Sequence, residues 1–322
     1  ECDWSSDVCS SDLYLDHIPG NLLARLTPHN FGFSDAAGLF VLLAGVSAAL
    51  AYSRPSDSTL RVLMRAAIIW IAQIALVLSA AGLVSLPAAA TANPAIAGHS
   101  LLIPFATNLP DAFARLVRLE LQPRYFDILQ LYVALLAWMP LVLLVMRANR
   151  FLGLALSCCV WAIGALAGVN PPAGDGGWFF NPLCWQLPFS LGVWIGLRKQ
   201  EARTGSRAMP GSRIAIVGAL ACLVFAALYV APWQQIPVAE IRAFRLVPSE
   251  LLGVISKTDE SLWRLAHVVC LAYVASRVVH PESQWLRHRL AREIGALGRR
   301  SLDRKSTRLN SSHIPLSRMP SS

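Results

Sequence analysis

The stretch VLMRAAIIWIAQIALVLSAAGLVSL, at residues 62–86, decides the fold class of this chain. Arg65 is its only charged residue, and the others are small or apolar apart from one Gln and two Ser. A helix needs about 20 mainly apolar residues to cross the hydrocarbon core of a lipid bilayer. The stretch therefore predicts a transmembrane helix.

Six other segments have the same character, and most of the loops between them are short. Residues 14–18 have the composition of the last turn of an earlier span, and residues 294–302 that of the approach to a later one. We therefore predict an all-α fold, a polytopic transmembrane helix bundle with seven full spans plus partial helices at each end. The six further spans are expected at residues 35–53, 125–146, 151–169, 181–197, 212–231 and 263–279.

The composition of the whole chain agrees with this fold class. Hydrophobic residues make up 55% of the 322 residues, charged residues only 15%, and the mean hydropathy is +0.50, above the value typical of a soluble domain. The net charge is +9, but the basic residues stand in short clusters between apolar runs. That pattern is typical of loop charges that orient a membrane protein, so we expect no nucleic-acid partner.

The basic clusters fall in every second loop, and this fixes the expected orientation. Cytoplasmic loops of membrane proteins are enriched in Lys and Arg. The alternate loops, at residues 19–34, 87–124, 170–180 and 232–262, are therefore expected to face outward, which in a bacterium means the periplasm, and the loop at 170–180 has no Lys or Arg at all. The cytoplasmic clusters are Arg54, Arg61 and Arg65; Arg147 and Arg150; Arg198 to Arg213; and Arg277 to Arg292.

Both ends of the chain differ from everything between them. Residues 1–13, ECDWSSDVCSSDL, and residues 303–322, DRKSTRLNSSHIPLSRMPSS, are polar and rich in Ser. They resemble the translation of a sequencing adapter, and we interpret them as adapter-like artefacts to be excluded from the fold. The alternative is a genuine disordered tail at each end. The domain proper is then expected at residues 14–302.

Small residues on the first full span favour close packing against a neighbouring helix. Gly38 and Gly45 lie seven residues apart on one helical face, and Ala48 and Ala49 follow them. Small side chains let membrane helices approach each other closely.

Polar residues within the predicted spans gather toward the outer side. A polar side chain at membrane depth costs free energy, so such residues usually mark a function. Several helices that each contribute a polar group at the same level predict a polar cavity open to the outside. The alternative is a set of interfacial residues in contact with headgroup water. The residues are Asp16, His17, Asp35, Asp127, Asn181, Gln186, Arg264 and His267.

Five longer motifs resemble a known family. They are LDHIPGN (15–21), HNFGFSDAAGLFVLLAGVSAALAY (29–52), YFDILQLY (125–132), DGGWFFNPLCWQLPFSLG (175–192) and KTDESLWRLAHVVCLAY (257–273). The chain resembles, from about residue 14 to 302, the OpgC family of bacterial inner-membrane proteins. These look like members of the acyltransferase-three superfamily and are associated with succinyl modification of osmoregulated periplasmic glucans.

The resemblance implies an incomplete integral membrane acyltransferase-like domain with a defined reaction. It implies transfer of a succinyl group from an acyl-CoA donor, succinyl-CoA, to hydroxyl groups of a periplasmic glucan, with no bound cofactor. The partners are then membrane lipids, the glucan acceptor and the acyl-CoA donor. A multi-pass transporter or flippase for a polar or acylated substrate is the alternative, and a membrane scaffold or sensor is a third possibility.

The resemblance also implies catalytic residues. The superfamily has an Arg upstream of a His on the first helix, and His17 stands at the His position. Ser6, inside the adapter-like stretch, stands at the Arg position, so the chain as given is expected to be inactive. His17 is the candidate general base with Asp16 beside it. The alternative for His17 is an interfacial residue that caps a helix end.

Six further residues are candidates for substrate binding, and each has a structural alternative. Either Asp35 or the preceding Ser34 can cap the first span, and Trp178 can belong to an interfacial aromatic belt. Arg264 and His267, one turn apart, either bind a succinyl carboxylate or form hydrogen bonds between helices. The complete set of substrate-binding candidates is Asp35, Asp175, Trp178, Asn181, Arg264 and His267. No metal ligand is predicted, because no cysteine has ligand spacing.

Overall fold

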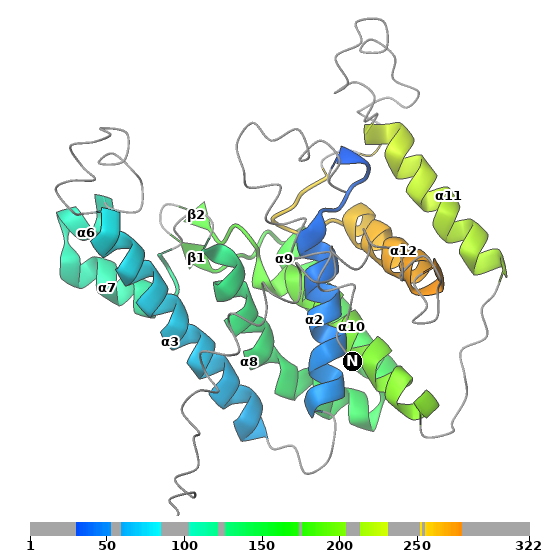
Figure 1. The fold of residues 1–322 in the computed structure, drawn as a ribbon, viewed down its shortest axis with the longest axis horizontal. Helices are drawn as coiled ribbons and strands as arrows, with labels where there is room; N and C mark the ends of the chain where they lie inside the picture. The colour runs from blue at the N-terminus through cyan, green and yellow to red at the C-terminus, as the bar shows by residue number, and fades with distance from the viewer. Residues whose placement is uncertain are drawn as a thin grey trace, which may run out of the picture. The chain divides into compact units, whose positions relative to one another are not determined.

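The computed structural model describes residues 30–52, 59–84, 103–121, 126–173, 176–203, 213–230, 252 and 255–278 (Figure 1). The chain divides into two compact units. Unit 1 comprises Glu1–Leu43, Pro210–Gly253 and Trp263–Ser322. Unit 2 comprises Ala44–Met209 and Val254–Leu262.

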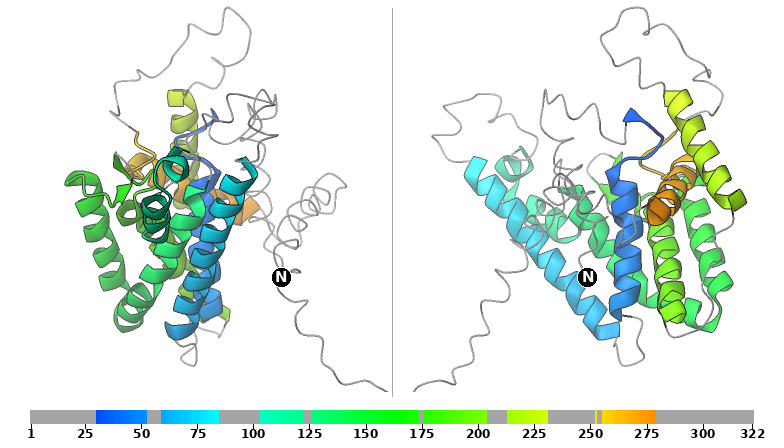
Figure 2. Two further views of the ribbon diagram at one scale, coloured as in Figure 1. Left: turned by 90° about the vertical axis from the view of Figure 1, so that its left-hand side faces the viewer. Right: turned by 45° about the vertical axis from the view of Figure 1, so that its right-hand side comes forward.

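Each of the seven predicted spans contains a helix, so the helical fold class is confirmed for the described residues. Long apolar runs form helices in this way because a helix pairs its backbone groups within one segment. Unit 1 contains α11 and α12, which Figures 1 and 2 both show side by side. The seven helices are α2 (Ala36–Tyr52), α3 (Thr59–Val84), α8 (Asp127–Ala148), α9 (Arg150–Leu166), α10 (Pro182–Arg203), α11 (Arg213–Val230) and α12 (Leu262–Val278).

Only part of the predicted number of spans is supported. Three of the described helices are long and apolar enough to cross a bilayer: Thr59–Leu83, Asp127–Ala148 and Arg213–Val230. Helices α2 and α9 are apolar but have 17 residues each. Helix α10 ends in the polar sequence RKQEAR, and α12 contains Arg264 and Arg277. The membrane class is thus supported, and the count of seven full spans stays a prediction.

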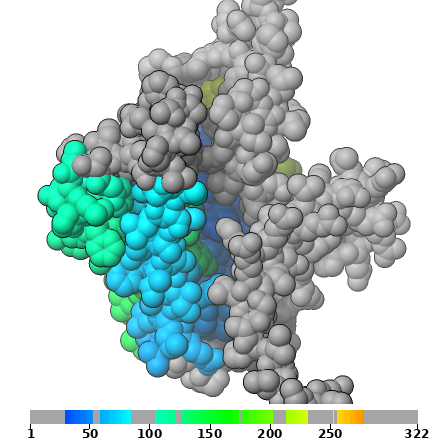
Figure 3. Space-filling view, turned by 60° about the vertical axis from the view of Figure 1, so that its left-hand side comes forward, coloured from blue at the N-terminus to red at the C-terminus, as the bar shows by residue number. Residues whose placement is uncertain are grey.

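The outward surface of α3 has the character expected of a helix in lipid. Along its length, large apolar side chains are exposed, among them Leu60, Met64, Ile68 and Leu83. Figure 3 shows this helix at the surface beside α6 and α7. In water such a continuous apolar face would be unfavourable, whereas hydrocarbon accepts it without cost.

Helices α3, α8, α9 and α10 of unit 2 pack in sequence order, α3 on α8, α8 on α9 and α9 on α10, and α10 also contacts α8. The carboxyl-terminal part of α2 approaches α10 very closely. A Cβ atom added at Gly45 would lie 2.1 Å from the carbonyl oxygen of Phe189, and one at Gly196 would lie 2.7 Å from Ala49 Cβ. The predicted close packing through Gly45 is confirmed.

The described residues of the predicted outer loop at 87–124 contain two helices that were not predicted, α6 (Ile103–Thr107) and α7 (Leu109–Val117). Asn108 caps α7, since its side-chain oxygen accepts a hydrogen bond from the N–H of Asp111 at 3.2 Å. Leu116 of α7 and Leu121, just after the helix, pack against Val77 of α3.

Three side chains of α3 and α8 donate hydrogen bonds to backbone carbonyls between Val117 and Phe126. The Trp70 indole donates to the carbonyl of Val117 at 3.1 Å, and the Gln73 amide donates to that of Phe126 at 3.0 Å. The Gln130 amide donates to the carbonyl of Leu119. Gln73 and Gln130, polar residues inside predicted spans, thus donate to backbone carbonyls, while their own Oε1 atoms are buried without a hydrogen-bond partner among the described residues.

A short hairpin stands between α9 and α10 and adds two strands that the all-α prediction did not include. Strands β1 (Pro172–Ala173) and β2 (Gly176–Gly177) pair antiparallel, with Pro172 opposite Gly177. The two adjacent glycines, Gly176 and Gly177, form β2 itself, and neither has a positive φ.

Candidate functional site

The two candidate catalytic residues, Asp16 and His17, lie outside the described residues, and so does Asp175. The other five candidates are described. Asp35, Arg264 and His267 belong to unit 1, whereas Trp178 and Asn181 belong to unit 2.

In unit 1, a loop of sequence FGFSD at residues 31–35 leads into α2, and α12 holds it by two polar side chains. The Ser34 hydroxyl and His267 Nδ1 are 2.6 Å apart in a hydrogen bond whose donor depends on the imidazole tautomer. Ser34 is 1% exposed and His267 is 4% exposed. Water therefore does not compete for this bond.

Arg264 makes the second connection, from one helical turn before His267. Its Nη1 donates to the carbonyl oxygen of Phe33 at 2.7 Å. Its Nη2 lies 3.1 Å from Oδ1 of Asp35, and the two side chains are only 7% and 13% exposed. Residues three apart on a helix share a face, so Arg264 and His267 contact the same loop. Arg264 binds Phe33 and Asp35, and His267 binds Ser34 between them.

Gly32 is required by the position of His267. A Cβ atom added at Gly32 would lie 2.0 Å from His267 Nε2, which is closer than any nonbonded contact allows. Only a residue without a side chain leaves room for the imidazole.

Phe33 closes the site with aromatic contacts. Its ring centroid lies 5.3 Å from that of Tyr229 of α11, 6.4 Å from that of Trp263 and 6.0 Å from that of His267, all in edge-to-face geometry. Such edge-to-face pairs stabilise beyond the area they bury. The loop is therefore fixed by apolar as well as polar contacts.

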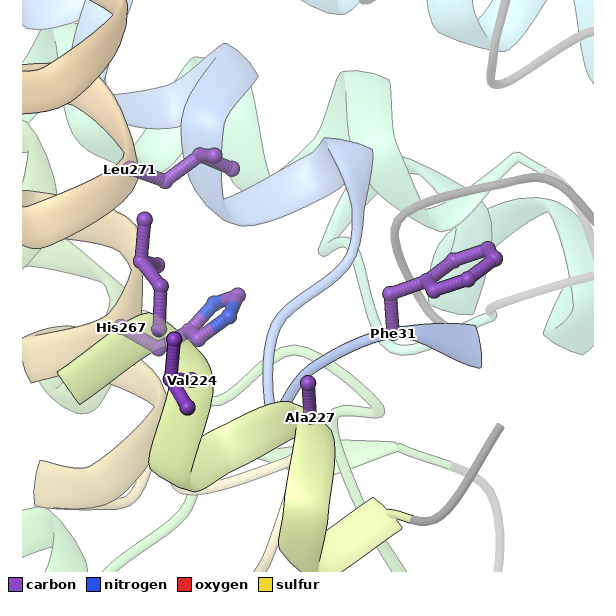
Figure 4. Close-up of a pocket in the computed structure, with 6 residues that line it drawn as sticks. Phe31, Val224, Ala227, His267 and Leu271 are labelled. Carbon is purple, nitrogen blue, oxygen red and sulfur yellow. The ribbon is translucent and has the colours of Figure 1, made fainter. Parts of the chain in front are cut away.

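A pocket of about 300 Å³ adjoins this network. Phe31 of the loop, residues of α11 and residues of α12 line it, and His267 is its polar lining residue. Figure 4 shows the imidazole of His267 between α11 and the loop that carries Phe31. The lining residues are Phe31, Leu223, Val224, Ala227, His267 and Leu271.

The guanidinium of Arg264 binds Asp35 and the Phe33 carbonyl, contacts of the structural kind that the sequence left open beside substrate binding. Asp35 directly precedes α2, as a cap does, and pairs with Arg264. Ser34 was noticed in the sequence only as a possible cap, because nothing local reveals a histidine partner 233 residues away.

In unit 2, Trp178 and Asn181 have structural surroundings. Trp178 is 6% exposed, so its ring faces the protein, whereas the neighbouring Phe179 is 49% exposed. Asn181 is fully buried. Its Oδ1 accepts from the N–H of Leu183 and its Nδ2 donates to the carbonyl of Val169, so it caps α10 and fastens the hairpin.

Sequence reasoning gave no role to the segment KTDES at residues 257–261, which unit 2 holds firmly. The indoles of Trp161 and Trp185 donate to the carbonyls of Glu260 and Lys257, at 3.1 and 3.0 Å. Glu260 is fully buried and has a positive φ of 41°, which is uncommon for a residue with a side chain. Its place in a family-like motif was the available signal.

Within the described part of the chain, no group of three His, Cys, Asp or Glu side chains is arranged to hold a metal ion. The functional groups of the unit 1 site are the Ser34 hydroxyl, the His267 imidazole and the Arg264–Asp35 ion pair, and an apolar pocket adjoins His267. These groups suit proton transfer and acyl transfer.

The sequence as a whole matches the family described as OpgC protein over residues 12–304. Residues 1–11 and 305–322 lie outside the match. No curated protein and no solved structure matches the chain. The matched region contains all of the described helices, the FGFSD loop and the KTDES segment, and it is far more than half of the sequence, so the chain belongs to the OpgC protein family.

Proposed function

We propose that this protein is a bacterial inner-membrane O-acyltransferase that transfers a succinyl group from an acyl-CoA donor to hydroxyl groups of a periplasmic glucan. The observation that carries the proposal is the family match over residues 12–304. Membership of that family and the long apolar helices indicate a membrane protein with an acyltransferase-like function. The succinyl group, the coenzyme A donor and the glucan acceptor are the proposed refinements.

The reaction needs a base that takes the proton of the attacking hydroxyl and donors that stabilise the tetrahedral oxyanion. We assign the base to His17, with Asp16 beside it, on the family resemblance of LDHIPGN. General base catalysis contributes about 10²–10⁴-fold to such rates. Loss of the imidazole is therefore expected to abolish detectable product.

Substrate binding is proposed for the outer ends of the helices. Asp175 and Asn181 are proposed to bind sugar hydroxyls, and Trp178 to form part of the sugar site. Phe179, 49% exposed beside the buried Trp178, offers a ring face on which a sugar can stack. Arg264, while it keeps its ion pair with Asp35, is proposed to bind a succinyl carboxylate through its remaining N–H groups, with His267 next to it.

The test replaces His17 by Ala in the full-length protein and measures acyl groups on periplasmic glucan by mass spectrometry. The expected result is a loss of acylated glucan at an unchanged amount of protein in the membrane. His99→Ala, in a predicted outer loop, is the matched control and is expected to acylate glucan normally.

A transporter would give a different result. Its His17→Ala variant would keep acylation and lose movement of substrate across the bilayer. Normal acylation in the variant would overturn the assignment of His17, and unmodified glucan in cells that carry the unaltered protein would overturn the function itself.

A further inference from the structure

We propose that Ser34 is a nucleophile and His267 its base, and that Ser34 carries the acyl group as an ester between donor and acceptor. The proposal rests on the acyltransferase function above. It adds a covalent step and two catalytic residues in unit 1 that the family resemblance does not assign.

The hydrogen bond between Ser34 and His267 is the first support. A serine hydroxyl is a weak nucleophile unless a base within hydrogen-bond reach takes its proton. Ser34 Oγ and His267 Nδ1 are 2.6 Å apart, and both side chains are buried. The neutral imidazole can accept the proton on Nδ1 while Nε2 keeps its own.

The second support is that the surrounding contacts fix the serine and the imidazole independently. Arg264 binds the carbonyl of Phe33 and the carboxylate of Asp35, the residues on either side of Ser34. Gly32 leaves the space that the imidazole occupies, and the Phe33 ring packs edge-on against it at 6.0 Å. Arg264 and Asp35 are thus positioning residues, and an ordered nucleophile and base lower the entropic part of the barrier.

The third support is that a pocket with room for an acyl group adjoins His267, although Ser34 is not among its lining residues. The pocket of about 300 Å³ has His267 in its lining and is otherwise apolar (Figure 4). This volume is at the lower end of small-molecule sites and suits a short acyl chain. In addition, α2 begins at Ala36, so the positive end of its dipole lies next to Ser34 in the chain, where an oxyanion would form.

The proposed chemistry balances in two half-reactions. In the first, His267 takes the Ser34 proton, Oγ bonds to the thioester carbonyl carbon, the carbon–sulfur bond breaks, and the thiolate leaves as a thiol with that proton. In the second, His17, the base proposed above for the attacking sugar hydroxyl, takes the hydroxyl proton, and the hydroxyl oxygen bonds to the ester carbonyl carbon. The bond to Oγ breaks and Oγ regains the proton. The sum is thioester plus alcohol to ester plus thiol.

The test uses Ser34→Ala and Ser34→Cys in the full-length protein, expressed in cells, with Ser157→Ala as the control. Ser157 is a buried serine of α9 whose hydroxyl has no hydrogen-bond partner among the described residues. We expect Ser34→Ala to lower acylated glucan at least 100-fold and Ser157→Ala to leave it within twofold. In Ser34→Cys the acyl group should accumulate as a thioester on the peptide that contains residue 34, detectable by mass and released by neutral hydroxylamine.

Two results would overturn the covalent step. One is a Ser34→Ala variant that retains more than a tenth of the glucan acylation of the unaltered protein. The other is an inactive Ser34→Ala variant together with a Ser34→Cys variant that carries no acyl adduct, which would leave Ser34 only the role of orienting His267. Both differ from failure of the proposed function, in which the unaltered protein itself yields no acylated glucan.

Discussion

Arg264 is the residue whose surroundings most constrain its role. The guanidinium is 7% exposed and its negative partner Asp35 is 13% exposed, so neither charge is well solvated. Removing one member of a buried ion pair leaves the other uncompensated, at a cost of about 3–5 kcal/mol. The pair therefore ties the FGFSD loop to α12 more firmly than a surface ion pair would.

We predict that Arg264→Ala lowers the free energy of unfolding by about 3 kcal/mol, because Asp35 then remains buried without its cation. The measurement is the thermal unfolding midpoint of the full-length protein in detergent. Arg277→Ala, at an exposed arginine over the Tyr273 ring, is the control and should leave the midpoint unchanged. If Asp35→Asn does not restore part of the stability lost in Arg264→Ala, the ion pair is not the cause.

Gly32 provides a second test at the scale of one residue. We predict that Gly32→Ala lowers glucan acylation at least tenfold, because the new methyl group would occupy the position of His267 Nε2 and displace the imidazole from Ser34. Gly176→Ala, where an added Cβ atom meets nothing within 4 Å, should acylate glucan normally. Equal activity of the two variants would contradict the fixed position of His267.

At this scale the sequence predicted which residues matter better than it predicted their partners. Asp35, Arg264 and His267 stood out because polar groups at membrane depth are costly. Their pairing was not predictable, since Arg264 and Asp35 are 229 positions apart and only the folded chain brings them together. Ser34 gave no signal of its own, because a serine before a helix is usually a cap.

At the scale of elements, the close contact of α2 with α10 decides whether unit 2 can pack. Gly45 faces the backbone of α10, where an added Cβ atom would lie 2.1 Å from the Phe189 carbonyl oxygen. Gly82 of α3 has nothing within 4 Å of the same position. The same substitution at these two glycines should therefore have opposite effects.

We predict that Gly45→Ala destabilises the protein by about 1–3 kcal/mol through overpacking, whereas Gly82→Ala stabilises α3 by up to about 1 kcal/mol through helix propensity. Both are measured as shifts of the unfolding midpoint in detergent. A Gly45→Ala variant as stable as Gly82→Ala would show that α2 does not approach α10 as closely as described.

Hydropathy predicted the long apolar helices but not the short elements. All seven long apolar runs contain helices, since a run of this length has no other way to satisfy its backbone in lipid. The short elements were missed for a physical reason. Helix α6 and the hairpin are too short to show a clear period, whereas α7 is short and amphipathic and so differs from the long apolar runs that hydropathy detects. Side chains of α3, such as Trp70 and Gln73, hold the segment around α7.

For the whole molecule, the proposed acylation of a periplasmic glucan requires lipid around the long helices and an outward position of the 170–180 hairpin. Three described helices qualify as spans by length and hydropathy. Basic residues stand at one end of them, as in Arg147 at the end of α8 and Arg213 at the start of α11. From the enrichment of cytoplasmic loops in arginine we predict that the hairpin faces the periplasm.

The most direct test of this claim fuses topology reporters to the full-length protein at residue 174, in the hairpin, and at residue 206, between α10 and α11. Alkaline phosphatase is active only outside the cytoplasmic membrane, and a fluorescent protein exported in unfolded form is dark there. We predict phosphatase activity without fluorescence at residue 174, and fluorescence without phosphatase activity at residue 206. The reverse pattern would put the outer loops in the cytoplasm and contradict acylation of a periplasmic glucan.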